Sequence, residues 1–325
     1  MLFTDAVTDF LEYLVVEKNR SPRTLVAYRH YFSRFSEWLG AKTQLEDITL
    51  EKVRKFRVYL SNFSDEHGEL LELKTQTYHL IALRSLLRYA AKRDIVCLSP
   101  EKIELPAQEA RQVQFLTSEE LDRLLTSPDT GTMAGLRDRA ILELLFSTGL
   151  RVSELASLDK TMLNTENGEM RVIGKGRKER LVFISERARA WISRYFSQRG
   201  DPNPAAFVGY KGKGAGNQPS PVVEALATRL TSRSVDRIVQ RYTLQAGLVK
   251  KITPHTLRHS FATDLLLNGA DIRSVQTLLG HASITTTQIY THITNQQLRE
   301  VHERFHGKKL EEQEISPAEE TVQGD

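Results

Sequence analysis

Apolar residues recur every three or four positions through the first ninety residues, which predicts amphipathic helices. One apolar stripe runs through residues 3–14 and a second through residues 25–39. Ser21-Pro22 supplies an N-cap and a first-turn proline for the second helix, and Gly40 ends it. Two more stripes predict helices that contain residues 53–60 and 80–87. We therefore expect a small helical bundle over residues 1–94.

The helical period is lost over residues 95–115, where Pro100 and Pro106 stand among polar residues. This segment is expected to link two domains. Thr117-Ser118-Glu119-Glu120 then forms a capping-box pattern at the start of a helix. Residues 138–147 are apolar enough for a buried helix that Gly149 would stop.

Two β-rich segments flank Gly174-Lys175-Gly176 within residues 171–184, which predicts a β-hairpin. Residues 200–221 are rich in Gly and Pro but lack the Walker spacing, so we expect a flexible loop.

Residues 253–306 contain several signals for the starts and ends of helices. Thr253-Pro254, Asp271 and Ser283 can each start a helix, while Gly269 and Gly280 can end one. The predicted fold is mainly α with a small β-hairpin: an N-terminal helical bundle, then an α+β domain over residues 116–306.

Length and composition agree with two globular domains. The chain has 325 residues, of which 40% are hydrophobic and 26% charged, with one cysteine. A disulfide framework is excluded, and no apolar run approaches the ~20 residues that span a bilayer. We expect a cytoplasmic protein that does not associate with a membrane.

Charge is unevenly distributed. The net charge is +4, yet residues 307–325 carry two lysines against six acidic residues. A basic body with an acidic, disordered tail is therefore predicted, and such a body permits binding to nucleic acid without requiring it. Basic residues that accompany the N-terminal helices could bind DNA or could simply form a solvated face; they include Arg20, Arg23, Arg29, Arg84 and Arg88.

Histidines concentrate near the C-terminus and allow two interpretations. His255 and His259 have the i, i+4 spacing of metal ligands, but Thr256 stands where a zinc protease has its glutamate. His255 and Arg258, at i, i+3, could instead present an imidazole and a guanidinium to one anionic group.

Two further candidates stand out. Tyr290 lies between His281 and His292 after a polar stretch, although a tyrosine more often packs or donates a hydrogen bond than reacts. Arg151 follows Gly149 at a predicted helix start, where an ion pair with Glu154 is the simplest expectation.

Taken together, these motifs resemble those of the tyrosine recombinases, or phage integrase family, most closely the bacterial Xer-type site-specific recombinases. The similarity rests on three boxes in order: Thr148-Gly149-Leu150-Arg151-Val152-Ser153-Glu154-Leu155, the hairpin residues 173–180, and His255-Thr256-Leu257-Arg258 with Leu279-Gly280-His281 and Tyr290-Thr291-His292. Ser21-Pro22-Arg23-Thr24-Leu25 and Tyr28 also resemble the family's core-binding domain. The loop over residues 200–232 is longer than in compact Xer-type proteins.

The resemblance implies a role for each residue. Tyr290 would attack a DNA phosphodiester to give a 3′-phosphotyrosine, while Arg151 and Arg258 stabilise charge on the non-bridging oxygens. Lys175 would protonate the leaving 5′-oxygen, His255 would assist proton transfer and His281 would hydrogen-bond the phosphate. Glu154 would support the arginines. No metal or other cofactor is implied.

The resemblance also implies partners. These are a double-stranded DNA site with inverted repeats, other recombinase subunits in a homo- or hetero-tetramer docked through residues 295–306, and a DNA translocase of the division machinery. Such a nucleoid-associated enzyme would resolve chromosome dimers, or would integrate and excise a mobile element. Two other functions remain open: a non-catalytic DNA-binding protein that uses residues 257–279 as a helix-turn-helix, and a metal-dependent hydrolase.

Overall fold

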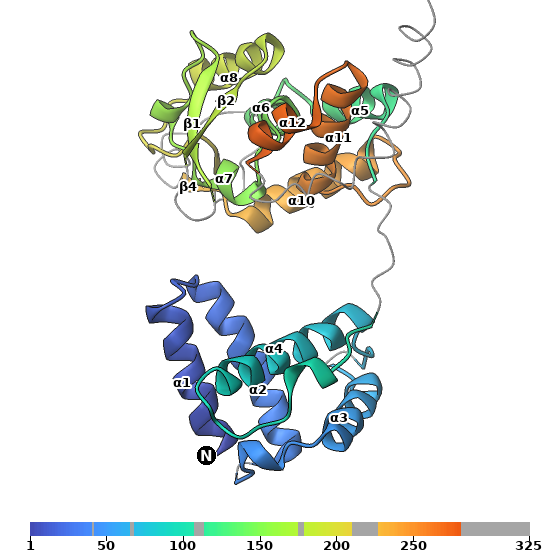
Figure 1. Ribbon diagram of the computed structural model, residues 1–325. Coiled ribbons are helices and arrows are strands. Elements are labelled where there is room, and N and C mark those ends of the chain that lie inside the picture. The colour runs from blue at the N-terminus through green and yellow to red at the C-terminus, as the bar shows by residue number, and fades with distance from the viewer. Residues whose placement is uncertain (41, 66–67, 107–113, 175–178, 210–226, 281–325) are drawn as a thin grey trace, which may run out of the picture. The chain divides into compact units, whose positions relative to one another are not determined.

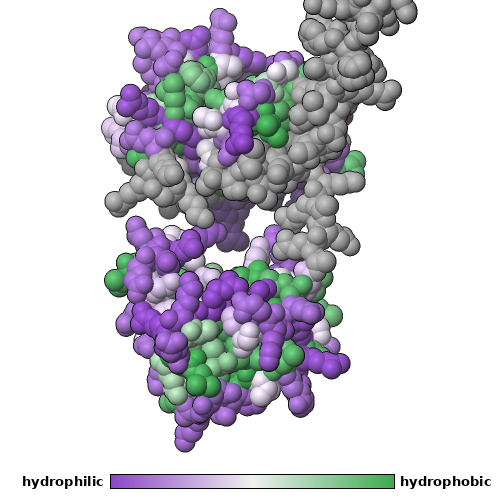
Figure 2. All heavy atoms as spheres, in the orientation of Figure 1, coloured by the Kyte–Doolittle hydropathy of each residue, from purple (hydrophilic) through white to green (hydrophobic). Residues whose placement is uncertain are grey.

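The computed structural model describes residues 1–40, 42–65, 68–106, 114–174, 179–209 and 227–280. The chain divides into two compact units, Met1–Ala110 and Arg111–Asp325. Each unit has its own hydrophobic core. In the space-filling view most of the coloured surface is hydrophilic, with smaller apolar areas on each unit (Figure 2).

The described part of the first unit contains four α-helices, as the apolar stripes predict, and Figure 1 shows how they are arranged. They are α1 (Phe3–Val16), α2 (Pro22–Leu39), α3 (Leu50–Asn62) and α4 (Leu73–Ala91). Ser21 caps α2 by accepting a hydrogen bond from the Thr24 N–H, and Gly40 ends that helix with φ +96°. The predicted local signals therefore set the bounds of α2.

Aromatic side chains dominate the core of this unit. The Phe3 and Phe35 ring centroids lie 5.1 Å apart, and the Phe35 and Phe56 centroids 4.7 Å apart in an edge-to-face pair. These contacts join α1, α2 and α3, and edge-to-face geometry adds to the burial energy of each ring.

The segment expected to be a linker begins inside this core. Ile103 follows a 3₁₀ helix, η2 (Pro100–Lys102), and is 1% exposed. Ile95, Leu98 and Leu105 pack against the same core. Residues 95–105 therefore extend the first unit past residue 94. The local pattern missed this because single apolar residues in an irregular segment have no period.

The second unit begins with three helices, α5 (Ser118–Thr126), α6 (Met133–Thr148) and α7 (Val152–Ser157). The predicted capping box is present: Thr117 accepts from the Glu120 N–H, and Glu120 accepts from the Thr117 N–H. The predicted buried helix is α6, which starts earlier than its apolar run. Gly149 ends α6 in the left-handed conformation, with φ +59°.

Helix α6 lies at the centre of this unit and buries charged as well as apolar side chains. Asp138, fully buried, accepts from Arg137 Nε at 2.8 Å and from the Tyr242 hydroxyl at 3.0 Å. Glu143 accepts from Arg139 Nε at 3.0 Å and from Arg187 Nε at 2.7 Å. Each buried charge thus has a partner, as burial of a charge requires.

The predicted β-hairpin is confirmed in its two arms. Strands β1 (Glu169–Ile173) and β2 (Glu179–Phe183) pair antiparallel, with Val172 opposite Arg180. The hairpin leads into α8 (Glu186–Gln198), and short strands β3 (Val208–Gly209) and β4 (Thr228–Arg229) follow. Most of the glycine-rich segment predicted as a loop lies outside the described residues.

Three helices complete the described chain: α10 (Ser232–Gln245), α11 (Pro254–Leu267) and α12 (Ile272–Leu279). The predicted starts are confirmed, because Thr253 caps α11 and Asp271 accepts from the Arg273 and Ser274 N–H groups of α12. Gly280 ends α12 with φ +63°. The helix predicted after Ser283 and the acidic tail lie outside the described residues. None of the helices in the described part of the chain combines the length and apolar character that crossing a membrane requires.

Candidate active site

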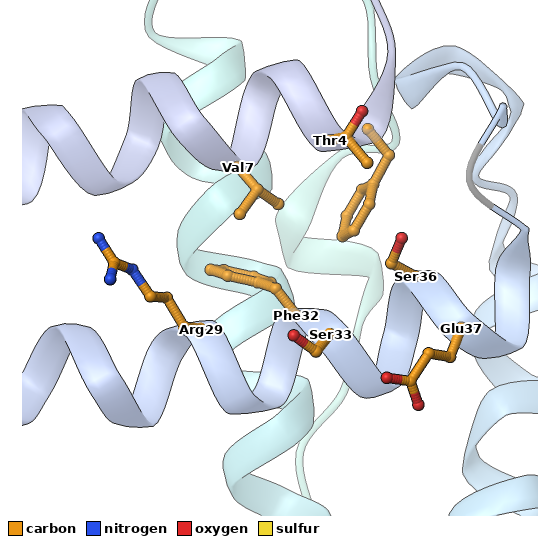
Figure 3. Close-up of a pocket in the computed structure, with 8 residues that line it drawn as sticks. Thr4, Val7, Arg29, Phe32, Ser33, Ser36 and Glu37 are labelled. Atoms are coloured by element: carbon orange, nitrogen blue, oxygen red, sulfur yellow. The ribbon is translucent and has the colours of Figure 1, made fainter.

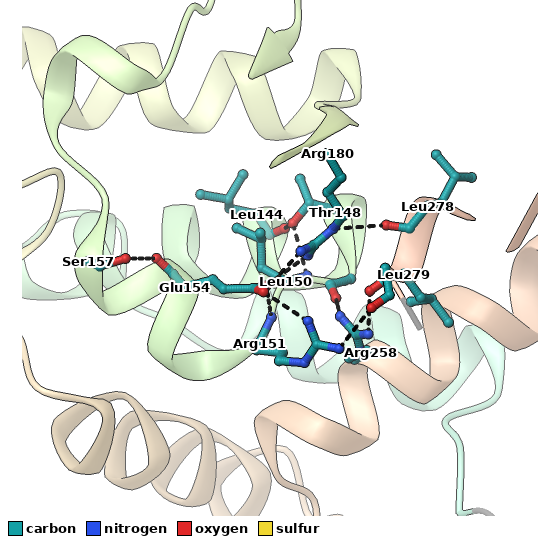
Figure 4. Close-up of polar contacts among 12 residues, drawn as sticks. Leu144, Thr148, Leu150, Arg151, Glu154, Ser157, Arg180, Arg258, Leu278 and Leu279 are labelled. Carbon is teal, nitrogen blue, oxygen red and sulfur yellow. Dashed lines mark hydrogen bonds and ion pairs between the residues drawn. The ribbon is translucent and has the colours of Figure 1, made fainter. Parts of the chain in front are cut away.

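Arg151 and Arg258, 107 positions apart in the chain, are drawn together by backbone carbonyls (Figure 4). Arg258 Nη1 donates to Gly149 O at 2.5 Å and Nη2 donates to Leu279 O at 2.6 Å. Arg151 Nη2 donates to Gly280 O at 3.3 Å. The turn at residues 149–151 and the end of α12 therefore meet around two guanidinium groups.

The two arginines differ in exposure. Arg258 is 4% exposed, because α11 buries it between α6 and α12. Arg151 is the N-cap residue of α7, and 28% of its side chain is exposed. Arg151 is therefore the arginine that solvent or a ligand reaches more readily.

Glu154 is the buried anion of this cluster. It accepts from the Arg151 N–H and Nη1, both at 2.9 Å, and from Arg180 Nη1 at 2.9 Å and Nη2 at 2.7 Å. Four donors match the four acceptor positions of a carboxylate. Burial alone would raise the pKa of Glu154, but the hydrogen bonds from Arg180 and Arg151 outweigh it and lower the pKa to about 2. Glu154 is therefore ionised, and the predicted pair between Arg151 and Glu154 is present.

Arg180 has no predicted role, yet its side chain is only 9% exposed and lies within this cluster. Besides both Glu154 oxygens, it contacts Leu278 O through Nε at 3.2 Å. The only signal in the sequence was its place on the hairpin near Lys175, because its partners lie 26 and 98 positions away.

The carbonyl groups at the C-terminal end of α12 accept hydrogen bonds from all three arginines of the cluster. Leu278 O, Leu279 O and Gly280 O accept from Arg180, Arg258 and Arg151 respectively. The last carbonyls of a helix have no partner within the helix and carry its partial negative charge, so guanidinium groups are favoured there. These contacts fix α12 against the cluster.

His255 stands on the first turn of α11, one turn before Arg258. It is exposed, but surrounding protein atoms partly desolvate the ring, and Arg258 and Arg151 add positive charge; together they lower its pKa. The positive charges of Arg151 and Arg258 both act on the His255 ring. The imidazole is therefore neutral at pH 7 and can accept a proton.

His259 is half-buried, and desolvation, with the charges of His255 and Arg258, lowers its pKa to about 4. Within the described ranges, no three His, Cys, Asp or Glu side chains stand where they could hold a metal ion together. His292, His302 and His306 lie outside those ranges.

The other predicted catalytic residues also lie outside the described residues: Lys175, His281 and Tyr290. The same holds for residues 295–306, predicted to dock into another subunit, and for the tail over residues 307–325. Of the six catalytic residues predicted, the structure thus brings together Arg151, His255 and Arg258.

The arginines predicted to bind DNA lie on or beside two helices of the first unit that pack together, α2 and α4. Arg23 and Arg29 are exposed on α2; Arg84 is half-buried and Arg88 exposed on α4, while Arg20 is exposed just before α2. The Tyr28 hydroxyl donates to Ser85 Oγ at 3.5 Å, a contact that joins α2 to α4. Arg88 forms a 3.6 Å ion pair with Glu101 in which both side chains are exposed.

Arg29 also borders a pocket of about 370 Å³ between α1 and α2. Figure 3 shows Val7 and Phe32 facing each other in this pocket, with Arg29 and Glu37 toward opposite ends. Nothing in its lining suggests a catalytic group.

Both units match known protein families. Residues 114–297 match the phage integrase family, and residues 7–94 match the N-terminal SAM-like domain of phage integrases. The first match spans more than half of the chain and includes every catalytic residue predicted above.

Relatives and solved structures agree with these matches. Tyrosine recombinase XerD of Listeria innocua is 37% identical over 313 residues, which cover 93% of this chain and 98% of that protein. Tyrosine recombinase XerC of Pelotomaculum thermopropionicum is 36% identical over 305 residues, covering 92% and 97%. The crystal structure of XerH site-specific recombinase bound to palindromic difH substrate, a post-cleavage complex, is similar with a TM-score of 0.67 and 26% identity, covering 87% of this chain and 80% of that one.

Proposed function

The chain belongs to the phage integrase family, and we propose that it is a site-specific tyrosine recombinase that cuts and rejoins double-stranded DNA. The observation that carries the proposal is the convergence of Arg151 and Arg258 at the end of α12, with His255 one turn before Arg258 on α11. Two guanidinium groups beside a neutral imidazole can bind a phosphodiester and accept a proton from its attacker. The curated relatives named tyrosine recombinases support the same reaction.

In the proposed reaction the Tyr290 oxygen attacks the scissile phosphorus. The new phosphorus–oxygen bond forms as the bond to the 5′-oxygen breaks, which leaves a 3′-phosphotyrosine and a free 5′-hydroxyl. His255 accepts the phenolic proton and Lys175 protonates the leaving oxygen. The phosphodiester bond energy is conserved in the covalent intermediate, so rejoining needs neither water nor ATP.

Arg151 and Arg258 stabilise the charge that develops on the non-bridging oxygens, and His281 donates a hydrogen bond to the same phosphate. Three guanidinium groups gather here with one carboxylate: Arg151 and Arg180 donate to Glu154, and Arg258 donates to the Gly149 carbonyl. This excess of positive charge favours a dianionic transition state over the monoanionic ground state.

The test of this reaction is a covalent adduct. A duplex containing an inverted-repeat site, selected by the protein from a random library and nicked beside the scissile phosphate, is incubated with the protein in EDTA. Wild-type protein is expected to form an adduct that survives denaturation and maps to the peptide containing Tyr290. Tyr290→Phe should abolish it, whereas Tyr195→Phe, at a fully buried position in the same unit, should not. An adduct that persists in Tyr290→Phe contradicts the nucleophile assignment.

The N-terminal unit is proposed to bind the same DNA through Arg20, Arg23, Arg29, Arg84 and Arg88. Each phosphate contact releases counterions, so DNA affinity decreases as the salt concentration rises. The magnitude of the slope of log affinity against log salt concentration should decrease by about 1 for each arginine replaced by glutamine. An unchanged slope in the Arg84→Gln, Arg88→Gln double variant would argue against this surface.

We also propose that the enzyme acts at the nucleoid in a tetramer of recombinase subunits, docked through residues 295–306, and resolves chromosome dimers. A DNA translocase of the division machinery is the proposed regulator. Deleting the chromosomal gene should produce filamentous cells with unseparated nucleoids. Normal cells that instead fail to integrate or excise one mobile element would assign the enzyme to that element.

A further inference from the structure

Arg180 lies on the inner face of the β-hairpin. It shares that face with Val182, because residues two apart on a strand point to the same side, and Val182 is buried. The side chain runs from β2 toward α7 and the end of α12, and Figure 4 shows it beside Thr148 and Leu278. Arg180 thus leaves the hairpin on the side of the catalytic cluster.

The Arg180 guanidinium contacts the cluster with three of its nitrogen atoms. Nη1 and Nη2 donate to the two Glu154 oxygens at 2.9 and 2.7 Å, and Nε donates to Leu278 O at 3.2 Å. This bidentate geometry fits an arginine fork and cannot be reproduced by a lysine. Its alkyl part is also closely packed, because a Cβ added to Gly280 would lie 2.9 Å from Arg180 Cδ.

Arg180 competes with Arg151 for Glu154. Both arginines donate to Oε1 at 2.9 Å, and Arg180 alone holds Oε2 with a side-chain donor. Without Arg180, both carboxylate oxygens become available to the Arg151 fork, which would turn onto Glu154 in a bidentate pair. The guanidinium of Arg151 would then be drawn away from the position in which it faces a ligand.

We propose that Arg180 is a positioning residue for DNA cleavage, which holds Glu154 so that Arg151 remains directed at the scissile phosphate. The inference rests on the proposed function. Arg180 acts through the carboxylate that it shares with Arg151, because both of its Nη atoms donate to Glu154. Its loss should therefore affect the stabilisation of phosphate charge more than the binding of DNA.

The test compares two substrates of the same selected sequence. In one the scissile linkage is an ordinary phosphodiester; in the other it is a methylphosphonate, in which a methyl group replaces one non-bridging oxygen. The methylphosphonate transition state carries one negative charge less and so depends less on a guanidinium clamp. Single-turnover rates of adduct formation are measured at saturating protein, which separates the chemical step from binding.

Arg180→Gln should slow cleavage of the phosphodiester by about 100-fold, the cost of a misplaced catalytic group, and should retain most of the wild-type rate on the methylphosphonate. The double variant Arg151→Gln, Arg180→Gln should lose no more than Arg151→Gln alone, because two residues that act through one interaction are not additive. Arg171→Gln, exposed on the same hairpin, is the matched control and should cleave both substrates at the wild-type ratio.

If Arg180→Gln slows cleavage of the two substrates equally, or slows neither, the inference is overturned. The proposed function still stands in that case, provided that wild-type protein forms the adduct and Tyr290→Phe does not. If wild-type protein forms no adduct on either substrate, the proposed function fails and the inference falls with it. Because Arg180→Gln leaves a buried carboxylate with fewer donors, Arg180→Lys is measured in parallel. It keeps a cation beside Glu154 and should show a smaller loss with the same preference for the methylphosphonate.

Discussion

Replacing Gly149 by alanine should destabilise the second unit more than the same change at Gly247. Both glycines have positive φ, +59° and +66°, so alanine costs about 1–2 kcal/mol in backbone conformation at either position. Their surroundings differ. A Cβ on Gly149 would lie 2.5 Å from Phe261 Cδ1, whereas no heavy atom lies within 4 Å of one on Gly247.

Relief of that contact requires Phe261 or the backbone to move, and overpacking of this kind costs about 1–3 kcal/mol. We therefore expect a loss of about 1–2 kcal/mol for Gly247→Ala and about 2–5 kcal/mol for Gly149→Ala. Gly149→Ala should also reduce cleavage, because Gly149 O accepts from Arg258 Nη1 at 2.5 Å and would be displaced.

Urea unfolding followed by tryptophan fluorescence measures this difference. The chain has two tryptophans, one packed against each core: Trp38 in the first unit and Trp191 in the second. In a Trp38→Phe background the signal therefore reports the unit that contains both glycines. Phe261→Leu should recover part of the loss in Gly149→Ala. Equal losses at the two glycines would refute the packing argument.

Two further predictions concern acid stability and the C-terminal tail. His79 is 2% exposed, and desolvation, with the charge of Arg34, lowers its pKa to about 4, so it stays neutral in the folded state while the unfolded chain takes up a proton near pH 6.5. The neutral His79 therefore stabilises the first unit above pH 6.5, and this stabilisation is lost as the pH falls toward 4. The free energy of unfolding should decrease by up to about 3 kcal/mol, as measured by Trp38 fluorescence in a Trp191→Phe background. A His79→Gln variant with the same pH dependence would contradict this. Deleting residues 310–325 should leave cleavage of the nicked substrate unchanged, and an adduct yield reduced in the truncated protein would show that the acidic tail takes part.

Local signals in the sequence predicted the helices well, because caps act within one turn. Ser21, Thr117 and Asp271 each accept from a backbone N–H two or three positions ahead. Gly149 and Gly280 end their helices at the predicted positions. The pair between Arg151 and Glu154 was predictable for the same reason, since the residues are three positions apart.

Contacts between distant segments were not predictable in this way. Arg180 carries no local mark that distinguishes it from the exposed Arg171, yet the fold directs it to Glu154, 26 positions away. Ile103 likewise has no periodic neighbours, although it is buried in the first core. The resemblance to the recombinases grouped Arg151 with Arg258, but only the folded chain shows that both donate to carbonyls at the end of α12.

Among the described residues, no side chain belongs both to the hydrophobic core of the first unit and to a hydrophobic cluster of the second. A mutation that repacks one core therefore changes none of the side chains that make up the other, so each core can accumulate substitutions at its own rate. A hybrid that joins one half to the complementary half of a relative should keep both interiors intact.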